Sequence, residues 1–363
     1  MTARSTSSSV LSTSPMNPAD ISCDFVPHAL TVEQAFDNII STVIPLTTTE
    51  HLPLREAFGR VLANPIIAQM DLPPHRNSAM DGYAIRFADL SADQPTHLPC
   101  VGKSFAGHPY PDALTEPACV QIMTGAVVPD GADTVIMQEH IQHDGEQIIF
   151  PASSKQTFGQ NIRHPRDDVS AGTQVLPAQT RLNAANLGLI ASLGIGEVSV
   201  LRKPRVAFFS TGDELKNVGE RLGMGDIYGS NRYPLYGMLR KLDVDLWDLG
   251  VIPDQPEAVE KAFREASQIS DVLITSGGAS VGDADYISQT LQRLGQVNFW
   301  KIAMKPGKPV AFGKLGECLF FGLPGNPVSV MATFLLFALP AIKKLQGLGT
   351  EKPRELSAIC DVN

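Results

Sequence analysis

Between Asp271 and Asp285 the chain reads Asp-Val-Leu-Ile-Thr-Ser-Gly-Gly-Ala-Ser-Val-Gly-Asp-Ala-Asp, and this stretch decides the fold. Its apolar first part predicts a buried strand, and its glycine-rich part predicts a loop that leads into a helix. The loop glycines can expose backbone N–H groups to a phosphate, since no Cβ stands in the way. A tight strand-to-helix turn explains the same residues equally well.

The same alternation of apolar runs and helix patterns continues on both sides of this stretch, from Lys203 to Leu345. Strands are predicted at residues 205–210, 244–251, 271–275, 297–302, 309–312 and 318–321, and helices at residues 234–242, 256–266, 285–294 and 327–345. Buried strands that alternate with helices in this way indicate a three-layer α/β domain with a mostly parallel sheet covered on both faces.

Three acidic residues fall where predicted strands end or the next helix begins, namely Glu214, Asp254 and Asp285. In a parallel sheet the carboxyl ends of the strands share one edge, and ligands bind beyond that edge. Three carboxylates at this edge could converge on Mg²⁺, which takes a few carboxylate oxygens together with phosphate oxygens. The alternative for Asp254 is a structural role as the N-cap of the helix that follows it.

Lysines gather around a second loop, which reads Lys301-Ile-Ala-Met-Lys305-Pro-Gly-Lys308-Pro309. It is followed by Gly322-Leu-Pro-Gly-Asn-Pro327, where Asn326 and Pro327 predict the N-cap and first position of a helix. A single lysine is usually a solvated surface residue. Three lysines around one Pro-Gly-Pro loop, beside a helix N-terminus, instead favour a binding site for an anion.

The N-terminal half of the chain has a different rhythm. Thr31-Val-Glu-Gln34 is a capping box, and it predicts a helix that ends at Pro45 and has one apolar face made of Ala35, Phe36, Ile39, Ile40 and Val43. Short β-prone runs between about residues 52 and 175 predict irregular β structure, and Asn183 predicts the cap of a helix at residues 184–193. Asp81 and Thr124 lie in the β region, and the residue pattern alone does not separate a turn from a functional role.

Composition limits the function classes. A chain of 363 residues with a net charge of −9 predicts two or three domains and argues against nucleic acid or an anionic membrane as partner. Neither a Walker nor a dinucleotide-binding glycine motif is present, no segment approaches the length of a membrane span, and residues 1–20 predict a flexible tail. A cytoplasmic, reducing compartment and no disulfide framework or zinc cage are expected, because the five cysteines are widely spaced: Cys23, Cys100, Cys119, Cys318 and Cys360.

Taken together and in order, these segments resemble the molybdopterin molybdenumtransferase (MoeA) family, which is related to the E-domain of gephyrin. The matching segments extend from about residue 30 to 350; they are Asn77-Ser-Ala-Met-Asp-Gly-Tyr83, Met123-Thr-Gly125, Ser210-Thr-Gly-Asp-Glu214, Thr275-Ser-Gly-Gly-Ala-Ser-Val-Gly-Asp-Ala-Asp-Tyr286, Lys305-Pro-Gly-Lys-Pro309 and Gly322-Leu-Pro-Gly-Asn-Pro-Val-Ser329.

The resemblance implies an enzyme of molybdenum cofactor biosynthesis that inserts molybdenum from molybdate into adenylylated molybdopterin with Mg²⁺ and releases AMP. Residues matching Lys305, Lys308 and Ser329 hold molybdate in the family, and those matching Glu214, Asp254 and Asp285 lie at the metal and phosphate end. It also implies catalytic roles for Asp81, Thr124, Glu214, Asp285 and Lys301, and cofactor binding by Ser276, Gly277, Gly278 and Ser280.

The resemblance further implies a homodimer with a shared active site, in which Asp81 and Thr124 of one subunit face the α/β domain of the other. Its partners would be a molybdopterin adenylyltransferase and later cofactor-maturation enzymes. The implied architecture is an N-terminal helix (21–48), a small discontinuous α+β domain (49–67 and 173–201), an irregular β domain (68–172), the α/β domain (202–349) and the first residues of a truncated β-barrel (350–363).

Two other functions remain open at this point. A molybdopterin adenylyltransferase resembles the α/β domain alone, and the long β region that contains Asp81 argues against it. A non-catalytic dimeric scaffold, as in the receptor-clustering role of gephyrin, would keep the fold and use another surface. The retained lysines and acidic residues favour an enzyme.

Overall fold

The computed structural model describes residues 29–145, 147–277 and 285–350, without the side chains of residues 285–289. The chain divides into two compact units, Met1–Thr47 with Arg202–Asn363 and Thr48–Leu201. The tail predicted at residues 1–20 and the barrel start predicted at residues 350–363 lie outside the described residues, except for Thr350.

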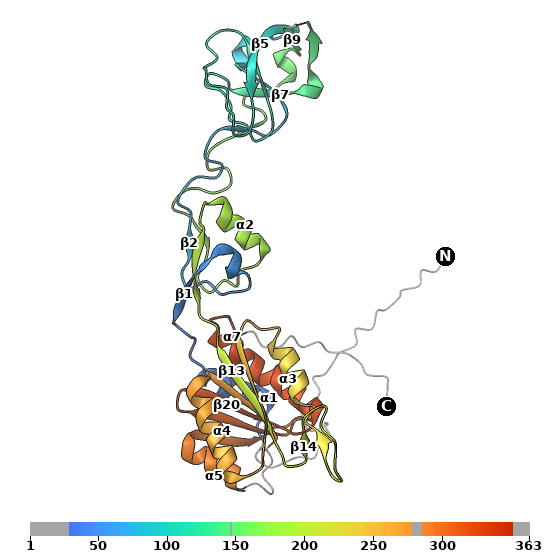
Figure 1. Cartoon of the computed structure of the whole chain (residues 1–363). Coiled ribbons are helices and arrows are strands. Elements are labelled where there is room, and N and C mark those ends of the chain that lie inside the picture. Colours follow the sequence, from blue (N-terminus) through green and yellow to red (C-terminus); the bar gives the residue numbers. More distant parts are fainter. Residues whose placement is uncertain (1–28, 146, 278–284, 351–363) are drawn as a thin grey trace, which may run out of the picture. The chain divides into compact units, whose positions relative to one another are not determined.

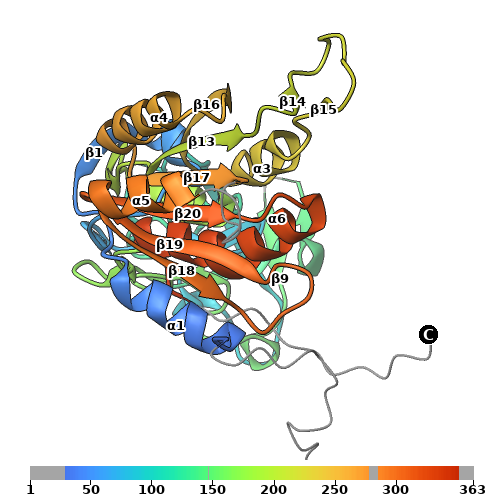
Figure 2. The same ribbon diagram turned by 90° about the horizontal axis from the view of Figure 1, so that it is seen from below.

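The first unit is built on one six-stranded sheet (Figures 1 and 2). Its strands, in spatial order, are β16 (Asp245–Ile252), β13 (Arg205–Thr211), β17 (Val272–Ser276), β20 (Cys318–Leu323), β19 (Pro309–Leu315) and β18 (Gln296–Lys301). The first four strands pair in parallel, as predicted, whereas β19 pairs antiparallel with both β20 and β18. The sheet is therefore mixed.

The antiparallel part follows from the connections between the strands. Only residues 302–308 join β18 to β19, and only Gly316 and Glu317 join β19 to β20. A parallel pair needs a crossover of a dozen residues or more, so connections this short permit only antiparallel neighbours.

Helices cover both faces of this sheet, which confirms the three-layer prediction. Alternate side chains of β13 point to opposite faces: Val206 and Phe208 belong to one buried cluster, and Ala207 and Phe209 belong to the other. The first cluster includes residues of α1 (Val32–Thr42), α3 (Arg232–Leu239), α6 (Pro327–Thr333), the π-helix η6 (Phe334–Ala338) and α7 (Leu339–Leu345). The second includes residues of α4 (Pro256–Ile269) and α5 (Asp285–Leu294).

The predicted N-terminal helix is present as α1, and its capping box is confirmed. Thr31 Oγ1 accepts a hydrogen bond from the Gln34 N–H at 3.1 Å, and Gln34 Oε1 accepts one from the Thr31 N–H at 2.9 Å. The apolar face packs into the first buried cluster. Leu30, just before the helix, forms a parallel bridge with Ile302 and so extends the sheet beyond β18.

The prediction that no segment approaches the length of a membrane span is wrong for one helix. Residues Pro327–Leu345 run through α6, η6 and α7 as 19 consecutive helical residues that are long and apolar enough to cross a membrane. However, 56% of their most apolar window is buried inside the fold. Val330, Phe334, Phe337 and Ile342 all lie in the first cluster, so the apolar character serves packing against the sheet.

The second unit contains the β structure predicted for the middle of the chain. One sheet orders β7 (Thr134–Met137), β4 (Gly82–Ile85), β6 (Cys119–Ile122), β5 (Thr96–Ser104), β9 (Gln147–Phe150) and β8 (Gln142–Asp144). Three strand pairs accompany it: β1 (Thr49–Pro53) with β12 (Glu197–Leu201), β2 (Ile66–Ile67) with β11 (Gln174–Leu176), and β3 (Asn77–Ser78) with β10 (Ile162–Arg163). The predicted helix is α2 (Ala184–Ser192), and Asn183 caps it through the Asn186 N–H.

The remaining short elements lie in connections. Two strands of the first unit, β14 (Leu215–Lys216) and β15 (Ile227–Tyr228), pair in parallel outside the main sheet. The second unit has the 3₁₀ turns η2 (Leu54–Ala57), η3 (Phe87–Asp89), η4 (Gln138–His140) and η5 (Ser153–Lys155).

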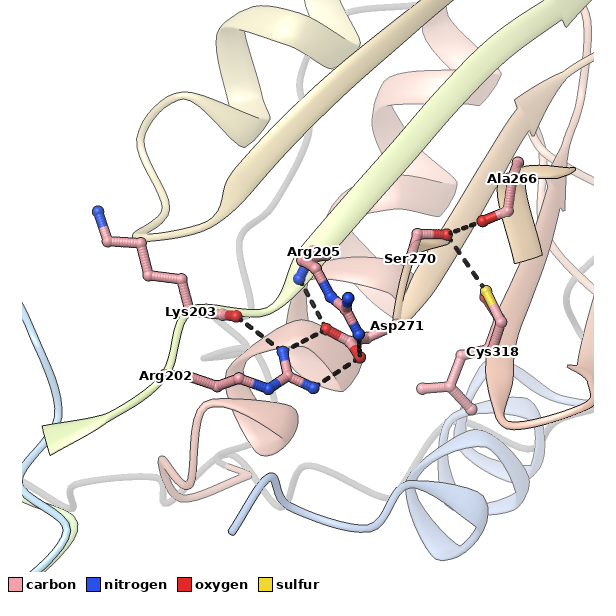
Figure 3. Close-up of polar contacts among 8 residues, drawn as sticks. Arg202, Lys203, Arg205, Ala266, Ser270, Asp271 and Cys318 are labelled. Atoms are coloured by element: carbon pink, nitrogen blue, oxygen red, sulfur yellow. Dashed lines mark hydrogen bonds and ion pairs between the residues drawn. The ribbon is translucent and has the colours of Figure 1, made fainter. Parts of the chain in front are cut away.

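A partly buried carboxylate ties the starts of two central strands together (Figure 3). Asp271, just before β17, accepts hydrogen bonds from Arg202 Nη1 at 2.7 Å and Nη2 at 2.8 Å, and from the Arg205 N–H at 2.8 Å. Burial alone would raise the pKa of Asp271, but the Arg202 guanidinium and the Arg205 N–H outweigh it, so the pKa is lowered. The group lies at the edge of the sheet opposite the carboxyl ends of β13 and β17.

Replacing Asp271 by asparagine is expected to reduce the free energy of unfolding by roughly 2–3 kcal/mol, because Arg202 loses its partly buried partner. Because the pKa of Asp271 is lower in the folded chain, the carboxylate stabilises the fold fully at pH values above 3.8, its usual pKa. This contribution is lost as the pH falls through the pKa of the folded state. Urea unfolding at pH 7 and pH 3 measures both effects. Asp245→Asn, the same change at an exposed position of β16, is the control, and an equal loss in the two variants would contradict the assignment.

Candidate functional site

The site residues predicted in the first unit come together at one edge of its sheet. The carboxyl ends of β13, β16, β17 and β20 share this edge because the four strands are parallel. Strand β18 is antiparallel to β19, which is antiparallel to β20, so β18 runs in the same direction as β20 and also ends there. The residues at or just beyond this edge are Glu214, Asp254, Ser276, Gly277, Lys301, Lys305, Lys308 and Ser329.

Three other predicted site residues lie wholly or partly outside the described part of the chain. Gly278 and Ser280 lie outside the described residues. Asp285 is the first residue of α5, which follows β17, but its side chain lies outside the described part of the chain. Their predicted roles remain predictions.

The lysine loop between β18 and β19 is closed at its base and packed against α6. The Ile302 N–H donates to the Lys308 carbonyl at 2.7 Å. Gly307 has φ of 108°, and a Cβ there would lie 2.9 Å from both Met304 Cε and Thr333 Cγ2. Only glycine fits this approach, which holds the loop on the helix while Lys305 and Lys308 remain exposed.

The helix that the loop packs against, α6, is capped at its start as predicted. Asn326 Oδ1 accepts hydrogen bonds from the Val328 N–H at 3.0 Å and the Ser329 N–H at 3.3 Å. Thr333, which Gly307 touches, donates from Oγ1 to the Ser329 carbonyl at 2.7 Å. Ser329 is therefore one helical turn from the residue that contacts the lysine loop, although Ser329 as a whole is only 5% exposed.

An asparagine that the sequence reasoning missed connects two loops of the edge. Asn231, just before α3, donates from Nδ2 to Ser276 Oγ at 2.8 Å and to the Gly325 carbonyl at 2.6 Å. Its own Oδ1 is buried, as is Ser210 Oγ at the end of β13, and neither atom has a hydrogen-bond partner in the described part of the chain. No motif marks Asn231, because a single polar residue in a loop carries no periodic signal. The edge thus retains polar atoms whose hydrogen-bonding capacity a ligand can use.

The acidic loops after β13 and β16 are joined by a second residue that was missed. Asp213 Oδ1 accepts a hydrogen bond from the Asp254 N–H at 3.0 Å. The neighbouring Glu214 carboxylate folds back over Gly212, where a Cβ would lie 2.6 Å from Glu214 Oε2. Among the described residues no group of three or more His, Cys, Asp or Glu side chains could hold a metal ion. Since the Asp285 side chain is not among them, the three-carboxylate site stays a prediction.

The remaining pair of predicted residues, Asp81 and Thr124, belongs to the second unit, where the two side chains touch. Asp81 precedes β4 and Thr124 follows β6, and these strands are antiparallel neighbours with Gly82 opposite Ile122. Asp81 Oδ1 accepts hydrogen bonds from the Thr124 N–H and from Thr124 Oγ1, both at 2.7 Å. The Thr124 N–H and then its hydroxyl lower the pKa of Asp81. The carboxylate is consequently held ionised in a fixed orientation.

Replacing Thr124 by valine is expected to raise the pKa of Asp81 part of the way to its usual value, because the hydroxyl donor is lost and the backbone donor remains. NMR titration of the Asp81 carboxyl carbon measures the change. The Asp71 carboxyl is an internal control, since its lowered pKa comes from the Ala171 N–H and Arg166. An unchanged Asp81 pKa, or an equal shift at Asp71, would contradict the geometry.

Two family models match the chain. The model described as "MoeA N-terminal region (domain I and II)" matches residues 30–194. The model described as "Probable molybdopterin binding domain" matches residues 207–344, which include the whole sheet of the first unit except the beginning of β13.

Known proteins resemble the chain over most of its length. A molybdopterin molybdenumtransferase of Haemophilus influenzae is 47% identical, over 92% of this chain and 82% of that protein. Gephyrin of Dictyostelium discoideum is 34% identical over 83% of this chain and 47% of its own length. The crystal structure of a molybdopterin biosynthesis MoeA protein from Pyrococcus horikoshii superposes with a TM-score of 0.75 at 31% identity, covering 88% of this chain and 80% of that one.

Proposed function

Because this chain belongs to the molybdopterin molybdenumtransferase (MoeA) family, we propose that it inserts molybdenum from molybdate into adenylylated molybdopterin and releases AMP. The reaction is a step of molybdenum cofactor biosynthesis, with Mg²⁺ as the metal cofactor. We place it in the cytoplasm, after a molybdopterin adenylyltransferase that supplies the substrate and before the enzymes that use the product.

The observation that carries this proposal is the lysine loop at the carboxyl edge of the sheet. Lys305 and Lys308 are exposed on a loop that Gly307 holds against α6, and Lys301 ends the strand that leads into it. Among the described residues, none of these three lysines forms an ion pair. Positive charges exposed on one loop without counterions attract an oxyanion with two negative charges such as molybdate.

The loop after β17 suits the phosphate and pterin part of the substrate. Gly277 has φ of 96°, and a Cβ there would lie 2.9 Å from the Thr211 carbonyl oxygen, so only glycine fits. Asn231 holds the Ser276 side chain at the end of β17. With the predicted residues Gly278 and Ser280, this loop would bind phosphate oxygens through backbone N–H groups.

The carboxylate groups of the acidic loops are suitable ligands for Mg²⁺. Glu214 and Asp254 supply carboxylates on adjacent loops that Asp213 ties together, and Asp285 begins the helix after the next strand. Carboxylate oxygens are the ligands that Mg²⁺ takes beside phosphate oxygens. When bound there, Mg²⁺ would neutralise the charge of the phosphate linkage that breaks.

The proposed reaction therefore needs positive charge on the lysine loop and negative charge on the acidic loops of one site. The lysines would orient molybdate, and Ser276 and Gly277 would position the substrate between the lysine and the acidic loops. The main contribution of the chain would be positioning and charge neutralisation.

We also propose a homodimer. In support, α3 and α6 pack side by side (Figure 2), and both carry exposed apolar side chains. These are Tyr233 and Tyr236 on α3 and Val328, Met331 and Leu335 on the α6–η6 segment. Apolar side chains at such spacing on two neighbouring helices are typical of a surface that a second subunit covers. Each active site would combine Asp81 and Thr124 of one subunit with the lysine loop of the other.

Replacing Lys305 by alanine is expected to lower the rate of molybdenum insertion by roughly 100-fold or more, because one charged donor to the oxyanion is lost. AMP release and molybdenum transfer are measured together from adenylylated molybdopterin, molybdate and Mg²⁺. Lys261→Ala, which removes an exposed lysine from α4, is the matched control and should leave the rate unchanged.

Other outcomes decide between the functions. Wild-type turnover of Lys305→Ala would remove this lysine from the mechanism. ATP-dependent adenylylation of molybdopterin by the unmodified chain would favour an adenylyltransferase. No turnover by the unmodified chain, with a stable protein partner that survives Lys305→Ala, would favour a scaffold.

Mixing two inactive variants is expected to restore activity if the site is shared between subunits. In a dimer of one Asp81→Asn chain and one Lys305→Ala chain, one site carries both substitutions and the other carries neither. Statistical mixing then returns about one quarter of the unmodified activity. Activity is measured after the two variants are refolded together and, as a control, after they are mixed without subunit exchange. If a dimer shown to contain one chain of each variant recovers no activity, Asp81 and Lys305 belong to the site of the same subunit.

A further inference from the structure

Two cysteines face each other across neighbouring strands of the second unit. β5 and β6 run in parallel, and their register pairs Cys100 with Cys119. Adjacent strands lie about 4.8 Å apart, and Cα separations of roughly 4.4–6.8 Å accommodate a disulfide. The ladder itself therefore brings two thiols that are distant in the sequence within bonding reach.

Both thiols lie toward the same face of the sheet. Side chains alternate along a strand, so Cys100 shares its face with Leu98, which belongs to the same buried cluster as Cys119. The register shifts between Cys100 and Gly102, leaving Val101 as an extra residue in β5. Cys100 is exposed beside this bulge, whereas Cys119 is 0% exposed. One thiol of the pair is accessible to a solute, and the other is reached only through it.

The surroundings of the two sulfurs make them chemically unequal. In the neutral pair, Cys100 Sγ donates to the Gly102 carbonyl and Cys119 Sγ donates to the Pro99 carbonyl, both at 3.5 Å. A hydrogen bond from the Cys119 thiol lowers the pKa of Cys100 to about 6, although partial burial acts in the opposite direction. The Gln121 and Gly102 N–H groups and the Lys103 charge contribute to this lowering. The hydrogen bond to Cys100 and then burial raise the pKa of Cys119.

We propose that Cys100 and Cys119 form a redox-active pair, which a hydroperoxide oxidises to an intramolecular disulfide. The Cys100 thiolate attacks one peroxide oxygen, the O–O bond breaks, and Cys100 becomes a sulfenic acid while the leaving hydroxide takes a proton to form water. Cys119 then loses its proton to solvent, and its sulfur attacks the Cys100 sulfur, the S–O bond breaks, and the leaving hydroxide takes a proton from solvent to form the second water. Two thiols give up two electrons in total, and hydrogen peroxide is reduced to two waters.

The division of roles follows from exposure and ionisation. Cys100 is the attacking thiol because it is exposed and ionised near neutral pH, and the thiolate is the reactive form. Cys119 is the resolving thiol because it lies opposite Cys100 and is shielded from the oxidant by the cluster of Tyr83, Ile136 and Phe150. Cys318, buried in the other unit beside Ser270, has no such partner in the described part of the chain, and burial raises its pKa to about 11.

The test is a titration of the reduced, folded chain with hydrogen peroxide, followed by mass spectrometry of peptides cut without reduction. A cross-link between the peptides containing Cys100 and Cys119, reversed by dithiothreitol, is expected. The rate of thiol loss should fall as the pH is lowered through about 6, the pKa of Cys100. A Cys100 that is oxidised alone in the unmodified chain, a disulfide between two chains, or a midpoint near 8.5, the usual cysteine pKa, would overturn the proposal.

Variants separate the two roles and control for folding. Cys119→Ala should still react at Cys100, but it should accumulate a sulfenic acid that dimedone traps, because no resolving thiol remains. Cys100→Ala should lose the fast reaction and leave Cys119 reduced, whereas Cys318→Ala should behave as the unmodified chain. Formation of a Cys100 disulfide in Cys119→Ala would assign the resolving role elsewhere. If Cys119→Ala does not fold, the peroxide titration of the unmodified chain by itself tests the proposal.

Discussion

The arrangement of the candidate site depends on the direction of one strand. β18 ends at the same sheet edge as β13, β16, β17 and β20 only because two antiparallel steps, β20 to β19 and β19 to β18, restore the original direction. The short connections on both sides of β19 leave no room for a crossover helix that would impose parallel pairing. With only one of these two reversals, Lys301 and the lysine loop would lie at the opposite edge from Glu214 and Asp254.

The order of strands then separates the charges along that edge. The acidic loops follow β13 and β16, the lysine loop follows β18, and the strand ends of β17 and β20 lie between them. β13 and β18 are four strands apart, which corresponds to about 19 Å at the usual strand spacing. This exceeds the Debye length of about 8 Å at physiological ionic strength, so the strand order alone does not pair these lysines with those carboxylates. An elongated substrate with molybdate near one end and a metal-bound phosphate near the other suits such a separation.

The sequence predicted the elements better than their pairing. The capping box of α1, the caps at Asn183 and Asn326 and the buried strands are local patterns, and the structure confirms them. The antiparallel β19 was not predicted, although its short connections contain the information. Asn231, Asp213 and the contact between Gly307 and Thr333 could not be predicted, because each depends on tertiary proximity between loops that no local pattern records. For Asp81 and Thr124 the residue pattern left turn and function open, and the hydrogen bonds between them appear only once β4 and β6 are paired.

The cysteine pair shows the same dependence on register, and its place in the sheet limits what its oxidation can change. β6 carries Cys119 at one end and leads to Thr124 at the other, so the redox pair and the Asp81–Thr124 pair share one short strand. That strand is also hydrogen-bonded to β4, where Gly82, Tyr83 and Ala84 pair with Ile122, Gln121 and Val120. The pairing of β5 with β9 ends at Pro99, so the bulge at Val101 can adjust to a disulfide, while the ladder to β4 resists movement of β6. Oxidation is therefore expected to fasten β5 to the sheet rather than to displace Thr124 from Asp81.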